Sequence, residues 1–449
     1  MAPLKLWCFR FVLLFSLAVF AYFSLLLWQE DILYQELERS NIELASIKDL
    51  DLASASSFAV KPLRLMLKSE AQNSRVEPML MTALADRYIL KKPLDVDGWL
   101  WKSLFHHRAG EIEASKSALS YAHRLSKRNM PSLSLVFNRY LELGAMQEAM
   151  DVAGDLSAAQ PKRFRSIFYL MSRLQSDYKD LIARVIPRNS SELSNSNEAY
   201  TVEYYYKVAM ADAIRAKNSD LAAAIWQAAP IAIREHSWFG NDYVEYLAYS
   251  QNDVVLSRAW KEHTRAELNV GIMPQQQFLE PSSEKASACW NLIALKGESF
   301  KHHLISYKDE MGLKVEFLGS SNFDYHHARC LFIVESGRQY RVRGYWRGDN
   351  ITTLSGPFFD VIAPSVSGVY FRSEPKIGSW PWSQFEFGFK APENVSVMTM
   401  RLRRVPTSFL DSKISGEISF SGIELVLVEE QNFTSQPTLK NRATLSVIE

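Results

Sequence analysis

The sequence predicts a multidomain chain with an N-terminal transmembrane helix, an all-α solenoid of helical repeats and an all-β, jelly-roll-like sandwich. Three observations carry this prediction. An uncharged apolar run lies near the start, apolar residues recur at helical spacing through the next part, and short alternating runs fill the last part. Recurrence once per helical turn is typical of amphipathic helices, and strict alternation is typical of half-buried strands. We therefore expect a cytoplasmic N-terminus (1–10), an anchor (11–28), a helical-repeat domain (31–270), a sandwich (285–430) and a flexible tail (431–449).

The apolar run from Phe11 to Trp28 contains two serines and no charge. As a helix it would be about 27 Å long, close to the roughly 30 Å thickness of a bilayer's hydrocarbon core. Lys5 and Arg10 precede it and acidic residues follow from Glu30 on, so the basic side should stay in the cytoplasm. A cleaved signal peptide would have a shorter run that ends in small residues. The sequence therefore favours a single-pass anchor with the later domains on the far side of the membrane.

Composition narrows the function further. Charged residues make up 22% of the 449 residues and the formal net charge is +1. The overall charge therefore gives no indication of nucleic-acid binding. Of three cysteines, Cys8 lies beside the anchor, and Cys289 and Cys330 fall in the exported part. No CxxC spacing suggests zinc or redox catalysis. Cys289 and Cys330 could form one disulfide in an oxidising compartment, or they could be two buried free thiols.

The breaks between the predicted helices recur at a fixed spacing. Gly110 and Gly144 both lie in turn sequences between amphipathic stretches. Further along, Asn218 and Asn252 lie in similar turns, and the two asparagines have the same separation as the two glycines. This separation is the length of one tetratricopeptide repeat, a helix–turn–helix unit of about 34 residues. One helical hairpin cannot bury its apolar face alone, whereas stacked neighbours can.

The chain resembles the tetratricopeptide family on particular residues of two units. In the first unit, Trp99 takes the family's aromatic position, Gly110 the turn and Ala122 the small residue of the second helix. In the next unit the matching residues are Tyr140, Gly144, Ala149 and Pro161. Ser103 and Phe137 depart from the family, which typically has a small glycine there. The resemblance implies four or five degenerate repeats and a groove that docks a protein partner. An irregular helical domain with coincidental spacing is the alternative.

Beyond a Pro-rich polar stretch at 271–284, the pattern changes to short alternating runs. Turn signals such as Gly348-Asp-Asn350 and Gly356-Pro357 separate them. Several such strands over about 145 residues predict an antiparallel sandwich of the jelly-roll kind. The expected strands include 313–317, 338–343, 384–389, 398–403 and 417–426.

Catalytic motifs are absent from the sequence. It contains no G-x-S-x-G elbow, no phosphate-binding loop and no H-E-x-x-H helix. The histidines come in adjacent pairs, and neighbours on a strand point to opposite faces, so they are poor joint ligands. We therefore expect a protein that is not an enzyme and has no metal and no cofactor.

Aromatic and arginine residues stand out in the predicted sandwich. Tyr345-Trp346-Arg347 precedes the Gly-Asp-Asn turn, and Trp380-Pro381-Trp382 lies in a predicted loop before a strand. Sugar rings have apolar C–H faces with hydroxyls at the rim, so flat aromatic rings beside hydrogen-bonding side chains suit them. We predict ligand contacts for Tyr345, Trp346, Arg347, Trp380 and Trp382. Core packing is the alternative for each tryptophan, and it is our assignment for Trp290.

The segments 400–406 and 410–425 carry a second resemblance, which extends over residues 272–428 at the level of pattern. They look like the closing strands of carbohydrate-binding-module-like jelly rolls that follow tetratricopeptide repeats in proteobacterial membrane proteins of exopolysaccharide or exosortase systems. Phe420-Ser421 replaces an aspartate and an asparagine usual there. The resemblance implies binding or scaffolding at the envelope rather than a reaction.

Three functions remain open on this basis. The leading one is a scaffold of envelope polysaccharide assembly or export, anchored in the bacterial inner membrane with its bulk in the periplasm. Its repeats would dock a protein, and its sandwich would contact glycan. The second is a purely protein-binding scaffold whose sandwich is structural. The third is a carbohydrate-active enzyme, which needs two carboxylates about 5–10 Å apart in a cleft.

Overall fold

The computed structural model describes residues 60–73, 77–127, 129–187, 201–250, 252–274, 290–292, 299–366, 368–408 and 412–428. The predicted anchor at 11–28 and the tail at 431–449 lie outside these residues. Within the described ranges, none of the helices combines the length and the apolar character that crossing a membrane would require.

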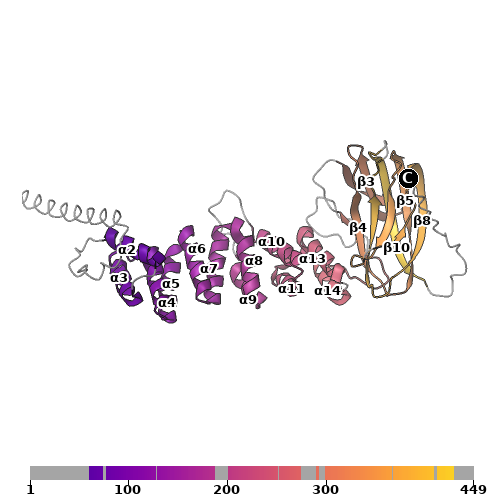
Figure 1. Ribbon diagram of the computed structural model, residues 1–449. Coiled ribbons are helices and arrows are strands. Elements are labelled where there is room, and N and C mark those ends of the chain that lie inside the picture. Colours follow the sequence, from indigo (N-terminus) through magenta and orange to yellow (C-terminus); the bar gives the residue numbers. More distant parts are fainter. Residues whose placement is uncertain are drawn as a thin grey trace, which may run out of the picture. The chain divides into compact units, whose positions relative to one another are not determined.

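The first part of the described chain is helical, as predicted (Figure 1). From α2 to α9, and again from α12 to α14, each helix packs against the next one along the chain. A short 3₁₀ helix, η2 (Pro161–Arg163), precedes α8. The α-helices are α2 (Val60–Asn73), α3 (Pro78–Lys91), α4 (Val96–Arg108), α5 (Ile112–Ser126), α6 (Met130–Glu142), α7 (Met146–Ala159), α8 (Phe164–Leu174), α9 (Tyr178–Val185), α10 (Val202–Arg215), α11 (Ser219–Ala228), α12 (Ile231–Glu235), α13 (Ser237–Ser250) and α14 (Asp253–Thr264).

The residues that recur at the repeat spacing end one helix and begin the next. Gly110 lies between α4 and α5 and Gly144 between α6 and α7, with φ of 81° and 66°. Glycine adopts this left-handed conformation without the steric cost of a Cβ. Asn218 and Asn252 are the N-caps of α11 and α14, and each side chain accepts a hydrogen bond from the backbone N–H three residues on. The turns therefore recur with the same local chemistry, while membership of the tetratricopeptide family stays a prediction.

Helix α7 approaches α9 closely at Gly154. A Cβ on this residue would lie 2.3 Å from the carbonyl oxygen of Arg184. At an exposed helix position, replacing glycine by alanine stabilises the helix by about 1 kcal/mol, because alanine has the higher helix propensity. Here we expect Gly154→Ala to lower the free energy of unfolding by about 1–3 kcal/mol, because the methyl group overpacks the contact. Urea denaturation checks this, with the exposed Gln147→Ala on the same helix as control. A stabilised Gly154→Ala variant would contradict the close approach.

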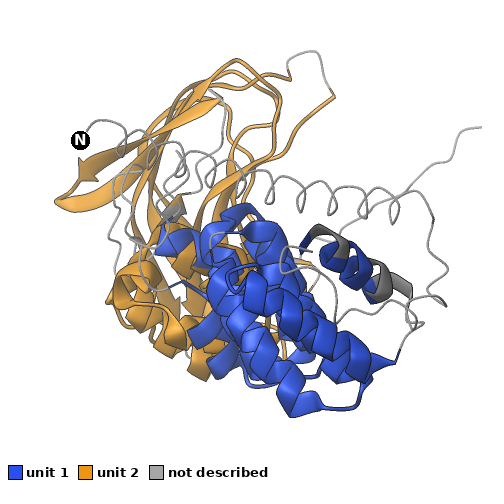
Figure 2. Ribbon diagram, turned by 90° about the vertical axis from the view of Figure 1, so that its left-hand side faces the viewer, with its two compact units in different colours: residues 1–205 blue, residues 206–449 orange. Residues whose placement is uncertain are grey.

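The chain divides into two compact units, residues 1–205 and 206–449 (Figure 2). The division falls within α10, so α11–α14 belong to the same unit as the strands. The connection after α14 contributes to this unit, because Val270 forms a parallel bridge with Ile333 and Met273 is buried in the core of the sandwich. Most of the linker predicted at 271–284 lies outside the described residues.

The last part is an antiparallel sandwich, as predicted. Among the described residues its two sheets have five strands each, ordered β1-β4-β9-β6-β7 and β2-β3-β10-β5-β8. The chain passes repeatedly from one sheet to the other, as in jelly rolls. The strands are β1 (Trp290–Leu292), β2 (Phe300–Tyr307), β3 (Glu310–Leu318), β4 (Tyr325–Ile333), β5 (Gln339–Ile351), β6 (Phe358–Ile362), β7 (Val369–Arg372), β8 (Gly378–Lys390), β9 (Val397–Arg404) and β10 (Ser415–Leu427).

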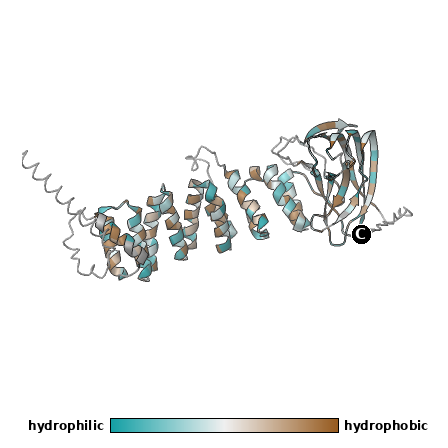
Figure 3. Ribbon diagram, turned by 45° about the horizontal axis from the view of Figure 1, so that its top comes forward, coloured by the Kyte–Doolittle hydropathy of each residue, from teal (hydrophilic) through white to brown (hydrophobic). Residues whose placement is uncertain are grey.

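The sandwich core consists of the alternate residues that face between the two sheets. Along β5, for example, Tyr340, Val342 and Trp346 are buried within this core. Figure 3 shows hydrophobic and hydrophilic positions mixed along strands and helices, as partly buried elements require. Trp290 is fully buried, which agrees with its assignment to the core. Cys330 is buried and disulfide-bonded. Its pairing with Cys289 stays a prediction, because Cys289 lies outside the described residues.

Two segments predicted as turn and loop are parts of strands instead. Gly348-Asp-Asn350 lies inside β5, and Trp380-Pro381-Trp382 lies inside β8. The pairing of these strands is irregular between Trp346 and Ile351. Asn350 has a φ of 52°, a conformation that turns commonly use. The irregular pairing accommodates the turn-forming residues as β-bulges, which sequence patterns do not distinguish from loops.

Candidate functional site

The candidate site lies on the outer face of the sheet β2-β3-β10-β5-β8, the face turned away from the core. Alternation along β5 determines which residues reach it. Tyr345, Arg347 and Asp349 are at least partly exposed, whereas Trp346 and Gly348 between them are buried. Tyr345 and Arg347, both predicted as ligand contacts, therefore lie together on the outer face.

Trp346 does not lie with them. Its side chain is 3% exposed and packs among core residues, with its ring centroid 5.6 Å from that of Phe359. The ligand contact predicted for Trp346 is therefore withdrawn, because a strand sends successive side chains to opposite faces. Trp380 also packs against the core, and its ring lies 5.3 Å from that of Trp346. Gly348 leaves room for it, since a Cβ there would lie 2.2 Å from the Trp380 ring.

Trp382 reaches the outer face because of a bulge. Trp346 pairs with Ser383, and Gly348 pairs with Trp380. Between these pairs β8 therefore has one residue more than β5, so Trp380 and Trp382 lie on opposite faces despite their spacing of two. Pro381 occupies this bulge, and β8 is an edge strand. Proline has no N–H for the hydrogen bonds between strands, and both a bulge and an edge strand can accommodate it.

Trp382 belongs to an aromatic group on the outer face. Its ring stacks on Tyr307 with the centroids 4.0 Å apart and the planes 13° apart. Tyr307 also lies 5.6 Å from Tyr345, centroid to centroid. The ammonium of Lys308 is 4.0 Å from the centroid of the Tyr345 ring, a cation–π distance. Two predicted contacts, Tyr345 and Trp382, are thus joined by a tyrosine and a lysine that the sequence did not single out.

Beside this aromatic group is a hollow of about 280 Å³, which we call the outer-face groove. All five strands of the sheet contribute to it. Its charges are paired, with Lys314 Nζ 3.1 Å from Glu417 and an Arg347 nitrogen 3.5 Å from Asp349. The lining residues are Ile305, Ser306, Lys314, Arg347, Asp349, Trp382, Glu417 and Ser419.

Most of the groove residues missed by sequence reasoning come from β2, β3 and β10, and Asp349 of β5 is one more. Glu417 pairs across the strands with Asp349, and Ser419 pairs with both Lys314 and Arg347. The only signal in the sequence was the alternation of the strands, which identifies the outward positions. It does not tell which strands are neighbours.

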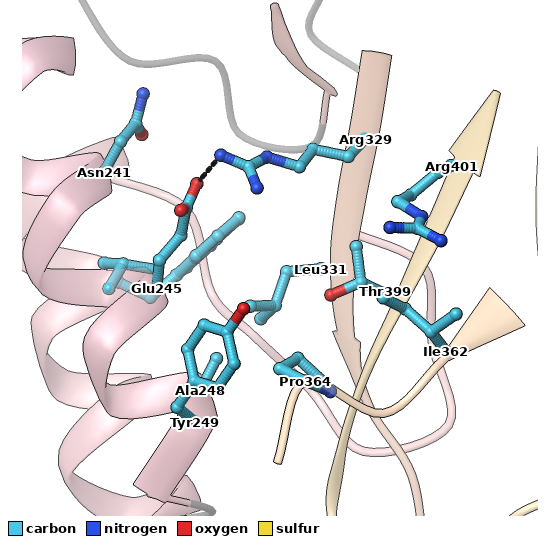
Figure 4. Close-up of a pocket in the computed structure, with 12 residues that line it drawn as sticks. Asn241, Glu245, Ala248, Tyr249, Arg329, Leu331, Ile362, Pro364, Thr399 and Arg401 are labelled. Carbon is cyan, nitrogen blue, oxygen red and sulfur yellow. Dashed lines mark ion pairs between the residues drawn. The ribbon is translucent and has the colours of Figure 1, made fainter. Parts of the chain in front are cut away.

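A second pocket, of about 100 Å³, lies within the unit 206–449 where α13 and α14 meet strands β4 and β9. Figure 4 shows Arg329 reaching from β4 toward Glu245 of α13, with which it forms an ion pair. Arg401 donates two hydrogen bonds, of 2.9 and 2.7 Å, to the carboxylate of buried Asp360. Each guanidinium in this pocket therefore already has a carboxylate partner. The outer-face groove, which is lined by the predicted ligand contacts Arg347 and Trp382, remains the better candidate.

The histidine pairs are not arranged as a metal site. Among the described residues, no group of three or more His, Cys, Asp or Glu side chains is placed to hold an ion. The Nε2 of His302 lies 2.8 Å from the hydroxyl of Tyr325, and that of His303 lies 2.9 Å from a Glu316 oxygen. Neighbouring histidines thus have separate partners on opposite faces of β2.

No protein-family model matches the chain, and no curated protein matches it. Among solved structures, one reported as "CBM4 structure and function" is similar with a TM-score of 0.21 and 12% identity over 28% of this chain and 78% of that chain. The enzymatically active domain of tailspike protein 4 of bacteriophage CBA120 has a TM-score of 0.22 and 9% identity over 31% of this chain and 19% of that chain.

A third similar structure is the K3 cleaved adhesin domain of Lys-gingipain from Porphyromonas gingivalis. Its TM-score is 0.18 and its identity 5%, over 26% of this chain and 73% of that chain. The TM-scores of all three structures are far below 0.5, so these likenesses carry no functional argument.

Proposed function

We propose that the outer-face groove binds a neutral glycan and that the protein is a non-catalytic binding scaffold. The observation that carries the proposal is the combination of the Tyr307–Trp382 aromatic pair with a polar groove beside it. Aromatic rings offer apolar faces to the C–H groups of a sugar. The hydroxyls of Ser306 and Ser419 supply groups that donate and accept hydrogen bonds with sugar hydroxyls.

The charge pattern favours a neutral ligand. Each charged residue in the groove lies beside an opposite charge, in the pairs Lys314–Glu417 and Arg347–Asp349. A polyanion would have to compete with Glu417 and Asp349 for the two cations. A neutral sugar can hydrogen-bond to both pairs without breaking them, since ion-paired groups keep free donors and acceptors.

Glycoside hydrolysis is the second candidate, because Asp349 and Glu417 face each other across neighbouring strands in the groove. A glycosidase needs one of two such carboxyl groups as a proton donor. Both groups instead lie beside cations, Glu417 beside Lys314 and Asp349 beside Arg347. This arrangement favours binding. Detection of shortened products after incubation with oligosaccharides, lost in Asp349→Asn and Glu417→Gln, would favour hydrolysis.

Other parts of the proposal rest on the sequence. The run 11–28 would hold the chain in a bacterial inner membrane, with the sandwich in the periplasm. The helical region would dock a protein of a polysaccharide assembly or export system, in the manner of repeat proteins. If the sandwich binds no glycan, the purely protein-binding scaffold is the function that remains.

A glycan array tests the proposal, and Trp382→Ala tests the site. We expect binding to neutral oligosaccharides, and a loss of about 2 kcal/mol, or roughly thirty-fold in Kd, in the variant because the stacking ring is gone. Titration calorimetry measures both proteins. Tyr249→Ala, which removes an exposed tyrosine from α13, should bind as the wild type does.

Two results would contradict this assignment. A wild-type protein that binds no neutral glycan on the array would remove the proposed function. An unchanged Kd in Trp382→Ala would place binding elsewhere in the molecule. Trp382→Phe, which keeps a ring, should retain part of the affinity and separates loss of stacking from loss of folding.

A further inference from the structure

The aromatic pair beside the groove joins the two edges of the sheet. In the order β2-β3-β10-β5-β8, three strands separate the strand of Tyr307 from the strand of Trp382. In a flat sheet these edges would be about 19 Å apart at the usual strand spacing. The ring centroids are nevertheless 4.0 Å apart. The two edges therefore curl toward each other, and the two rings form a bridge over the outer face.

The bridge is fastened to the strands beneath it. Tyr307 ends β2 at a hairpin whose two turn residues, Lys308 and Asp309, have φ of 53° and 63°. Non-glycine residues are uncommon in this conformation. The turn brings the side chain of Lys308 over the Tyr345 ring. A glycine at this turn position has no side chain and would not make this contact. On β10, the hydroxyl of Ser421 donates to the carbonyl oxygens of Glu310 and Met311, at 3.4 and 3.1 Å.

The bridge limits the ways in which a ligand can enter the groove. Residues of β2 form one side, Ile305 and Ser306, and Trp382 of β8 forms the other. Tyr307, which directly follows Ser306 in β2, stacks on Trp382, so the ring pair joins these two sides. The cross-strand pair Asp349 and Glu417 lines another part of the groove, where no such stack of described residues spans it. A long chain lying in the groove would meet this ring pair.

We infer that the groove takes the end of a glycan chain and not an internal stretch. This inference rests on the proposed function and makes it narrower. The terminal sugar would lie against Trp382, with its hydroxyls toward Ser419 and Arg347 on the floor of the groove. The rest of the chain would leave past Asp349 and Glu417. Tyr307 is then a specificity-determining residue, because it closes the path that an internal stretch would need.

The test compares short and long chains of the same sugar. A panel of linear neutral oligosaccharides of three to eight sugars, and the polymers of those sugars, is titrated by calorimetry against the wild-type protein. We expect a molar affinity that stops rising after a few sugars. We also expect each polymer to saturate at one or two proteins per chain, whatever its length, because each chain has only two ends.

The variant Tyr307→Ala removes the bridge, and Tyr307→Phe is its matched control because it keeps the ring. In Tyr307→Ala the number of proteins bound per polymer chain should rise severalfold and increase with chain length. Tyr307→Phe should keep the wild-type stoichiometry. These numbers report on access to the groove and are separate from the overall affinity.

The outcomes distinguish this inference from the function on which it rests. Wild-type protein that saturates a polymer in proportion to its length binds internal stretches, which would overturn the end-binding inference and leave glycan binding intact. Absence of binding across the whole panel would overturn both. If Tyr307→Ala fails to fold, the stoichiometry of the wild type alone decides.

Discussion

Replacement of Asp360 by alanine is expected to lower the free energy of unfolding by about 3–5 kcal/mol. This is the usual cost of removing one partner of a buried ion pair and leaving the other charge uncompensated. Asp360 is fully buried and accepts two hydrogen bonds from Arg401, and Arg403 lies 3.7 Å away. Without the carboxylate, two guanidinium groups with side chains 16% and 23% exposed lose their shared anion. Urea denaturation followed by tryptophan fluorescence measures the loss.

The control is an exposed ion pair of the same sandwich. Arg341 and Glu386 lie on β5 and β8 with side chains 41% and 44% exposed. Glu386→Gln should change stability by no more than about 1 kcal/mol, because solvent screens this pair. Asp360→Asn, which keeps the volume of the side chain, should lie between the two. An Asp360→Ala protein as stable as Glu386→Gln would contradict the importance assigned to this anion.

Acid is expected to destabilise the sandwich between pH 6.5 and pH 4 through His302 and His327. Burial, together with the positive charge of a neighbouring histidine, lowers the pKa of each to about 4. In the unfolded chain the pKa returns to about 6.5, so the unfolded state binds more protons in this range. The contribution of these histidines to stability is therefore fully present above the unfolded pKa. The free energy of unfolding falls as the pH drops toward 4, by as much as about 1.4 kcal/mol per pH unit for each histidine.

The variant His327→Asn isolates one of these protons. Other groups titrate below pH 5, so the useful quantity is the difference between the variant and the wild type. From pH 7 to pH 5 we expect the variant to lose about 2 kcal/mol less stability than the wild type. The reason is that the pKa of His327 is about 4 in the folded state, so in this range only the unfolded state takes up its proton. Parallel denaturation curves at the two pH values measure it. Equal losses would mean that His327 is protonated in the folded protein.

Much of the fold could be predicted from periodicity. The helical spacing of apolar residues predicts the helices, and the alternating runs predict strands such as β3 and β9. The composition of residues 348–350 and 380–382 is that of turns, so the sequence alone predicts a turn and a loop there. In the structure they are parts of strands, because a bulge can use the same residues inside a ladder.

The candidate site could be predicted only in part. Tyr345 and Arg347 lie on the outer face as a ligand contact requires, and Trp382 joins them there. Trp346 and Trp380 have the same chemistry but pack in or against the core. Tyr307, which completes the aromatic pair, was missed because it is distant in sequence from the other members.

The sequence by itself determined the succession of a helical half and a sandwich, since the helical and the alternating hydrophobic period are both local properties. It also supplied the aromatic and charged residues from which the groove is built. Only the tertiary structure decided which tryptophan faces outward, because one extra residue in β8 reverses the side of every residue beyond it. The meeting of Tyr307 and Trp382 was decided in the same way, because it depends on strand order and on the curl of the whole sheet.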